Sequence, residues 1–150
     1  MFQLLIRSIA LTFFLLSSGH ANLGNLKDSG SKNSAMVEGK VALQEENWST
    51  AINIFEGVLE QLSDSADVHN FLGYAHRKSG NIDKALEHYE MALEINPDHK
   101  STLEYLGEAY ISLGDLERAN AQLNHLKSLC TPIPCEELKE LEQALLRATK

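Results

Sequence analysis

The hydrophobic positions of this chain recur at three- and four-residue steps, which is the spacing of one face of an α-helix. Two such runs fill residues 72–97, "LGYAHRKSGNIDKALEHYEMALEINP", with Ser79-Gly80-Asn81 between them. Gly80 suits the left-handed residue that ends a helix, and Asn81 suits the residue that caps the next one. The second run stops at Asn96-Pro97, because the residue before a proline avoids the helical region. The pattern predicts a helix over 66–79, a tight turn and a second helix.

The helical pair is repeated with a period of 34 residues, and a fixed period predicts a stack of like units. Leu72-Gly73 returns as Leu106-Gly107, and Gly80 returns as Gly114. Two further matched sets are Ala51, Ala85 and Ala119, and Phe55, Tyr89 and Leu123. The small residues predict close approach of paired helices, with the larger Tyr89 or Leu123 filling the space beside them. We expect a degenerate unit at 35–65 and two fuller units at 66–99 and 100–133.

The middle unit resembles the tetratricopeptide repeat, a helix–turn–helix of the same length. The matching residues are Leu72, Gly73, Gly80, Ala85, Tyr89, Ala92 and Pro97. The resemblance covers roughly residues 32–133. It implies an all-α fold, a right-handed α-solenoid of about three repeats, in which the first helix of each pair lines a concave groove. The arrangement also resembles small exported bacterial repeat proteins, although that likeness says little about their task.

The segments around the repeats predict a leader and a cap. Residues 22–34 are polar and rich in Gly and Ser, which favours a flexible leader. Residues 135–149 place Leu138, Leu141 and Leu145 on one face of a predicted amphipathic helix, as the end of a repeat array needs. Cys130 and Cys135 lie close together in the sequence and favour a disulfide in an oxidising compartment, with free thiols or a metal site as alternatives.

The first 21 residues have the three-part layout of a secretory signal peptide. Arg7 precedes an apolar run over 9–16, and the small residues Gly19 and Ala21 stand two apart. We expect cleavage after Ala21 and a periplasmic or secreted location. An uncleaved N-terminal anchor is the alternative; the apolar run is shorter than the roughly 20 residues that span a bilayer.

Composition and charge exclude several function classes. The formal net charge of −8 disfavours a nucleic-acid binder, which needs a basic patch for phosphates. No stretch alternates β-branched residues, so an all-β fold is not expected. The chain has no GxSxG, HExxH or phosphate-binding glycine loop, and its glutamate pairs fit helical surfaces. We therefore expect no enzyme, no catalytic residue and no cofactor.

The histidines do not predict a metal centre. His69 and His76 lie seven residues apart on one predicted helix face, where the repeat places packing residues. His88 and His125 fall on positions expected to be outward or partly covered, and His99 falls in a connection. Packing and solvation are the favoured interpretations of all five.

The groove of the resemblance is the predicted binding site. The predicted groove residues are Lys40, Asn70, Tyr74, Arg77, Lys78, Glu104 and Glu108. Arg77 is expected to take a ligand carboxylate in bidentate fashion, and Tyr74 to serve as an aromatic anchor. The family's chaperone-tail clamp is not implied, because Met36, Phe71 and Ser101 replace its polar residues.

The leading hypothesis is a non-enzymatic scaffold that binds a protein or peptide in an exported compartment. One alternative is a structural or assembly subunit that acts through its convex face or its ends. Another is a small metal- or cofactor-handling protein that uses His69, His76 and Cys130.

Overall fold

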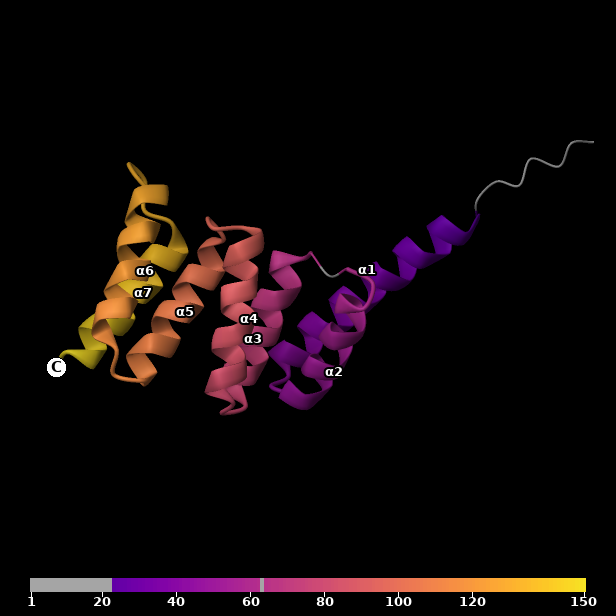
Figure 1. Cartoon of the computed structure of the whole chain (residues 1–150), viewed down its shortest axis with the longest axis horizontal. Coiled ribbons are helices and arrows are strands. Elements are labelled where there is room, and N and C mark those ends of the chain that lie inside the picture. The colour runs from indigo at the N-terminus through magenta and orange to yellow at the C-terminus, as the bar shows by residue number, and fades with distance from the viewer. Residues whose placement is uncertain (1–22, 63) are drawn as a thin grey trace, which may run out of the picture.

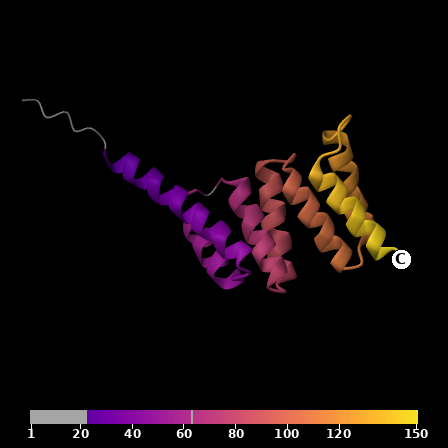
Figure 2. The ribbon, with the colours of Figure 1, turned by 180° about the vertical axis from the view of Figure 1, so that it is seen from behind.

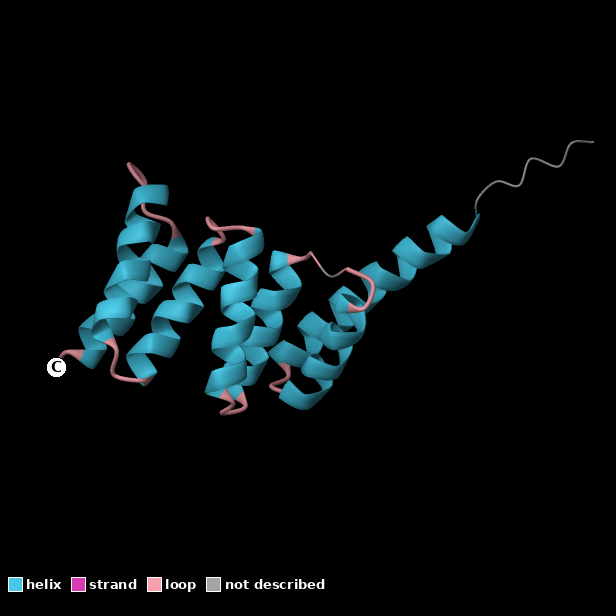
Figure 3. Ribbon diagram, viewed as in Figure 1, coloured by secondary structure: helices cyan, strands magenta, loops and turns pink. Residues whose placement is uncertain are grey.

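The computed structural model describes residues 23–62 and 64–150. The predicted signal peptide and its cleavage site therefore lie outside the described residues. Seven helices and no strands occur in the described part of the chain (Figures 1 and 3). Their bounds are α1 Leu23–Gln44, α2 Trp48–Leu59, α3 Ala66–Lys78, α4 Ile82–Ile95, α5 Lys100–Ser112, α6 Leu116–Leu129 and α7 Glu136–Ala148.

The helices form three consecutive antiparallel pairs and a last single helix. The pairs are α1–α2, α3–α4 and α5–α6, and each second helix also packs on the first helix of the next pair. Helix α7 follows α6 and lies against α5 (Figure 2). The all-α solenoid of helical hairpins with a C-terminal helix is confirmed. Among the described residues no helix is both long and apolar enough to span a membrane.

The tight turns explain the helix boundaries. The side chains of Asn47, Asn81 and Asp115 each accept a hydrogen bond from the backbone N–H three residues later. Each cap satisfies a donor that the first helical turn leaves free. Gly80 and Gly114 have φ values of 88° and 74°, as predicted for left-handed helix ends. The matched residue of the first unit is Glu46, whose φ is 57° although it carries a side chain.

The small repeat residues lie where the paired helices touch. Ala51, Ala85 and Ala119 are all completely buried, so the predicted register is confirmed. A Cβ added to Gly39 would meet the ring of Phe55, and one added to Gly73 would meet the ring of Tyr89. The close approach of these helices thus depends on the absent side chain.

The third unit departs from this arrangement. A Cβ on Gly107 would meet Leu141 of α7, not Leu123 as predicted from the register. Leu123 lacks the reach of the aromatic ring at Tyr89, and the capping helix fills the space in its place. Helix α7 is therefore part of the core of the third unit as well as its cover, and Leu141 is completely buried.

The N-terminal end of the array differs from the prediction, whereas the C-terminal end agrees with it. At the N-terminal end, α1 begins at Leu23, so residues 23–34 are helical where a flexible leader is predicted. No proline interrupts 23–44, and a helix already nucleated by its packed half extends at little further cost. At the other end Cys130 and Cys135 form a disulfide with a Cα–Cα distance of 5.4 Å, which joins α6 to α7 as predicted. Closing this small loop stabilises the fold by about 2 kcal/mol on the chain-entropy account.

Candidate functional site

The first helices of the pairs line one face of the array, which we call the inner face. Helix α5 packs against α3 on one side and α7 on the other, and α1 continues this side of the array (Figure 2). All seven predicted groove residues come from α1, α3 and α5. The structure therefore brings most of them to one face, with the exceptions given below.

Three aromatic side chains form an aromatic strip across the units: Trp48, Tyr74 and Tyr105. The ring centroids of Trp48 and Tyr74 lie 6.0 Å apart in an edge-to-face arrangement, and those of Tyr74 and Tyr105 lie 5.0 Å apart. All three side chains are half-buried. Tyr74 was predicted as an anchor, whereas Trp48 and Tyr105 were not assigned to the site. Their spacing of 26 and 31 residues from Tyr74 does not follow the repeat period, so only the packing of the helices brings them together.

Cationic side chains lie over the aromatic strip. The guanidinium carbon of Arg77 is 5.6 Å from the Tyr74 ring centroid and 5.7 Å from that of Tyr105. The Nζ atom of Lys78 is about equally far from the rings of Trp48 and Tyr74, at 5.9 and 6.0 Å. Lys40 lies apart from the strip, with its Nζ 5.0 Å from the ring centroid of Phe71. Cations at such distances from ring faces are attracted by the π-electrons.

Arg77 has a carboxylate partner within the chain, and its bidentate contact with a ligand carboxylate stays a prediction. Its Nη2 atom donates to Oε2 of Glu108 at 2.7 Å, so one edge of the guanidinium already has a carboxylate partner. Its Nε atom is buried and has no hydrogen-bond partner. A ligand carboxylate would have to compete with Glu108 for this arginine.

Glu104 occupies an acidic part of the inner face. Burial, together with the neighbouring carboxylates of Glu108, Glu137 and Glu140, raises the pKa of Glu104 to about 7. Burial also raises the pKa of Tyr105 to about 12, with Glu104 as the next cause. Close to neutral pH, Glu104 therefore exchanges between its charged and neutral forms.

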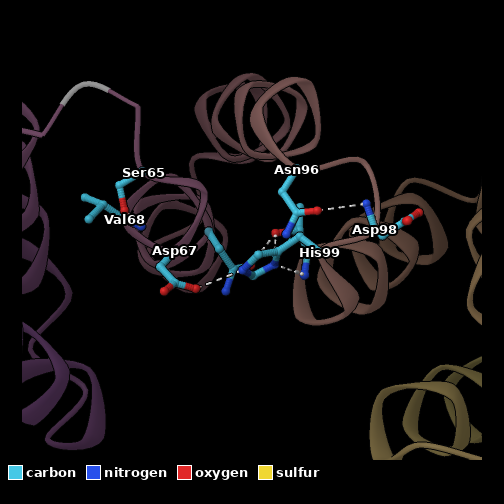
Figure 4. A network of polar contacts seen from close by, with 8 residues as sticks. Ser65, Asp67, Val68, Asn96, Asp98 and His99 are labelled. Carbon is cyan, nitrogen blue, oxygen red and sulfur yellow. Dashed lines mark hydrogen bonds and ion pairs between the residues drawn. The ribbon is translucent and has the colours of Figure 1, made fainter. Parts of the chain in front are cut away.

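Asn70 does not face a ligand, which corrects its prediction as a groove residue. It is 3% exposed, and its Oδ1 accepts a hydrogen bond from the Thr102 hydroxyl at 3.1 Å. The same hydroxyl lies 2.8 Å from Nδ1 of His99, whose Nε2 is 2.9 Å from Asp67 Oδ1 (Figure 4). This junction network joins α3 to the start of α5. His99, predicted to be solvated, also caps α5 by accepting from the Thr102 N–H.

The junction network has the carboxylate–imidazole–hydroxyl order of a hydrolase triad, but it is not placed to act as one. A catalytic hydroxyl must reach a substrate carbonyl, and Thr102 is completely buried. Its hydroxyl is also shared between His99 and Asn70. The network therefore fixes the orientation of two neighbouring units.

Three histidines, which we call the histidine seam, lie between α3 and α4: His69, His76 and His88. His69 and His76 are 7% and 5% exposed, so their packing role is confirmed. The Nδ1 atoms of His69 and His88 are 3.1 Å apart, and the ring of His88 stacks on that of His76. Burial, together with the two other imidazoles, lowers the pKa of His88 to about 4. His88 is half-buried, which agrees with the expectation that this position is outward or partly covered, and it is part of this contact.

The residues proposed for a metal are not gathered in one place. Cys130 is bonded to Cys135, so its sulfur is not a thiolate ligand. Within the described residues no group of three or more histidine, cysteine or carboxylate side chains has the arrangement of a metal site.

A shallow hollow of about 380 Å³ opens on the inner face between α3, α5 and α7. Its lining combines two arginines and a glutamate with small and apolar side chains: Arg77, Glu108, Ile111, Ser112, Ala144, Arg147 and Ala148. The hollow adjoins the aromatic strip through Arg77. Together they offer apolar contact area and charged groups to a side chain or segment of a partner.

Comparison with known proteins supports the assignment of the repeat. The family model described as tetratricopeptide repeat matches residues 66–99, which include α3 and α4. The uncharacterized protein ycf37 of Pyropia yezoensis is 30% identical over 95 residues. The match covers 63% of this chain and 49% of that protein, so the chain spans about half the length of its curated relative.

Solved structures show the same fold. The TPR2B domain of yeast Sti1, in complex with pHsp70, superposes with a TM-score of 0.71 at 17% identity over 79% of this chain and 95% of that one. PcrH in complex with the chaperone binding region of PopD gives 0.71 at 19% identity over 81% and 92%. At these identities the likeness concerns the fold alone.

Proposed function

We propose that this chain is a tetratricopeptide repeat protein that binds a protein or peptide partner along its inner face without catalysing a reaction. The aromatic strip with its cations is the observation that carries this proposal. Half-buried tyrosine, tryptophan and arginine are the side chains that contribute most to binding energy at interfaces. Here they come from three consecutive units and form a continuous surface.

The two structural neighbours were both solved with a bound partner, which supports a binding role for the fold. The partners bound in those two structures are not assigned to this chain, because the likeness concerns the fold alone. On this face Lys78 has no acidic partner among the described residues, whereas Arg77 is paired with Glu108. Lys78 is thus a cation beside the aromatic strip that is free to meet a carboxylate of the ligand.

The proposed place of action is an exported compartment, either periplasmic or secreted. The residue pattern of the first 21 residues and the disulfide between Cys130 and Cys135 support it. Mass spectrometry of the chain recovered from its own cell tests this part. A new N-terminus at Asn22 is expected, and recovery of the intact chain from the cytoplasm would refute export.

Photocrosslinking in the cell tests the inner face as the binding site. A photoreactive phenylalanine analogue placed at Tyr74 should form adducts with a protein partner. The same analogue placed at Glu90, which is exposed on α4, should not. Equal adducts from both positions, or adducts from position 90 alone, would contradict the proposal.

A matched pair of lysine variants then tests the role of charge. Lys78→Ala should weaken binding of the crosslinked partner about tenfold, a typical effect of removing one interface charge that is well placed. Lys84→Ala removes an exposed lysine from α4 and should leave affinity unchanged. Both variants should melt at nearly the temperature of the unaltered protein, because exposed charges contribute little to stability.

A further inference from the structure

The hollow on the inner face contains a cation that has no carboxylate partner among the described residues. Two arginines and one glutamate line this hollow, which has a volume of about 380 Å³ between α3, α5 and α7. Nη2 of Arg77 donates to Oε2 of Glu108 at 2.7 Å, so these two charges offset each other. Arg147 is exposed and forms no ion pair within the described part of the chain. The lining therefore leaves one positive charge uncompensated.

The two arginines come from the ends of two different helices. Arg77 lies in the last turn of α3 and Arg147 in the last turn of α7, where the helix dipole favours a cation. The dipole accounts for a basic residue at each helix end. It does not account for the meeting of both around one hollow whose lining also includes Ile111 and Ala148. Apolar lining with a few convergent polar groups is the usual composition of a ligand site.

The acidic residues of α7 do not cancel this positive charge. Glu140 lies seven residues before Arg147, which is roughly 10 Å along the helix axis. Charges are largely screened beyond about 8 Å at physiological ionic strength. Glu142 is nearer, but it pairs with Lys127 of α6. Lys78, the last residue of α3, adds to the positive potential, so the electrostatics of the hollow favour an anionic group.

The Arg77–Glu108 ion pair is an internal competitor for such a group. The side chain of Arg77 is 18% exposed and that of Glu108 is 25% exposed. An ion pair in contact with solvent contributes little to stability, so Glu108 can leave Arg77 at a small cost. The rings of Tyr74 and Tyr105 still hold the guanidinium after Glu108 has left. Glu104 also acts on Arg77, but burial and its neighbouring carboxylates raise its pKa to about 7, so it is partly neutral near neutral pH.

We infer that the hollow accepts an acidic side chain of the partner, which displaces Glu108 from Arg77 and pairs with Arg77 and Arg147 together. An apolar residue next to that acidic residue packs against Ile111 and Ala148. In the unbound protein, Glu108 thus occupies the position on Arg77 that the partner's carboxylate takes in the complex. This inference rests on the proposed binding role of the inner face and adds the chemistry of one part of the partner.

Two short peptides that differ in one charge test the hollow directly. Their sequences are Gly-Ser-Leu-Glu-Leu-Ser-Gly and Gly-Ser-Leu-Gln-Leu-Ser-Gly, and both are acetylated and amidated so that terminal charges play no part. Titration into the full chain, labelled with nitrogen-15 and observed by NMR at pH 7, should shift the amides of Ile111, Ser112 and Ala148. The glutamate peptide should bind with a Kd of roughly 1 mM, at least about threefold below that of the glutamine peptide. Equal affinities, or no shift of these amides up to about 10 mM, would overturn the inference.

Glu108→Gln gives the sharpest result, because it removes an internal competitor from Arg77. The glutamate peptide should bind this variant about three- to tenfold more tightly, whereas affinity for the glutamine peptide should stay the same. Arg147→Gln should abolish the preference for the glutamate peptide. The matched control Glu94→Gln removes the same charge from an exposed position of α4 and should change neither affinity. Unchanged or weaker binding of the glutamate peptide by Glu108→Gln, with its helical circular dichroism intact, would refute the displacement of Glu108.

The partner from the cell provides an independent test. The photoreactive phenylalanine analogue placed at Ser112, an exposed residue of the hollow, should form an adduct whose joined segment mass spectrometry identifies. That segment should contain an aspartate or glutamate beside the joined residue, and its replacement by the amide should weaken binding about tenfold. If the analogue at Tyr74 captures a partner whose segment at Ser112 has no acidic residue, this inference fails while the proposed binding role stands. Absence of adducts from both positions would contradict both.

Discussion

Two half-buried ionisable groups are expected to change the free energy of unfolding with pH in opposite directions, so that their effects largely cancel in the unaltered protein. Glu104 on α5 has a pKa raised from 4.5 to about 7, because burial and three carboxylates disfavour its charge. His88 on α4 has a pKa lowered from 6.5 to about 4, because burial and its histidine neighbours disfavour its charge. Between pH 4.5 and 6.5, folding therefore adds a proton at Glu104 and removes one at His88.

The two contributions to the free energy of unfolding have opposite signs. The stability contributed by Glu104 is complete below pH 4.5 and is lost as the pH rises through about 7. The stability contributed by His88 is complete above pH 6.5 and is lost as the pH falls through about 4. In the window between 4.5 and 6.5 the slopes oppose each other, so the stability of the unaltered protein should change little.

The size of each contribution follows from the pKa displacements. A difference of one in pKa corresponds to about 1.4 kcal/mol, so full transfer of either displacement would give about 3 kcal/mol. Both side chains are only half-buried, and solvent screening reduces each contribution to about 1–2 kcal/mol. His76, whose pKa burial also lowers, adds to the effect of His88.

Single substitutions should reveal the two slopes. Glu104→Gln leaves the histidines, so stability should rise by about 1–2 kcal/mol from pH 4.5 to 6.5. His88→Asn keeps an acceptor or donor for His69 and leaves Glu104, so stability should fall over most of the same range. Urea unfolding at closely spaced pH values measures both, with the m-value as a check that two-state unfolding is preserved. Parallel pH curves for the unaltered protein and Glu104→Gln would refute the reasoning.

The remaining predictions concern glycine positions. Glu46→Gly should raise the free energy of unfolding by about 0.5–1 kcal/mol, because residue 46 has a left-handed φ of 57° that costs a side-chain-bearing residue energy; chemical unfolding measures it, and a loss of stability would contradict the assignment. Gly73→Ala should lower the melting temperature and cost about 1–3 kcal/mol, because the new Cβ would lie 2.5 Å from buried Tyr89. The matched control Gly57→Ala meets nothing within 4 Å and should be stabilising, so equal losses in both variants would refute the packing argument.

The fold was predictable because it depends on local signals that recur. Gly80 and Asn81 mark a turn by their own backbone and side-chain preferences, and the same pair of roles returns 34 residues later at Gly114 and Asp115. Each such signal acts within a few residues of chain. The positions of the helices and the burial of the matched alanines follow from these signals.

The binding face was predictable only in part, because its chemistry depends on which remote side chains meet. The register placed Asn70 and Arg77 on the face-lining helices, but it contained no information on the partners that hold them. Asn70 bonds to Thr102 and Arg77 bonds to Glu108, which lie 32 and 31 residues away in the sequence. The packing of α3 against α5 brings these pairs together. In the same way, the packing of remote helices places Leu141 of α7 beside Gly107, where the register predicted Leu123.

The histidine seam divides the apolar interior into two clusters. One joins α1, α2 and one side of α3, and the other runs from α4 to α7. Imidazoles occupy part of the boundary between them, so the second cluster packs largely independently of the first. Within the described residues the first hairpin has a neighbouring unit on one side alone, so it can detach from α3 at a free energy below that of global unfolding. In such an opened form Trp48 would leave Tyr74 while Tyr105 stayed beside it, so the chain could release one end of a bound segment before the other.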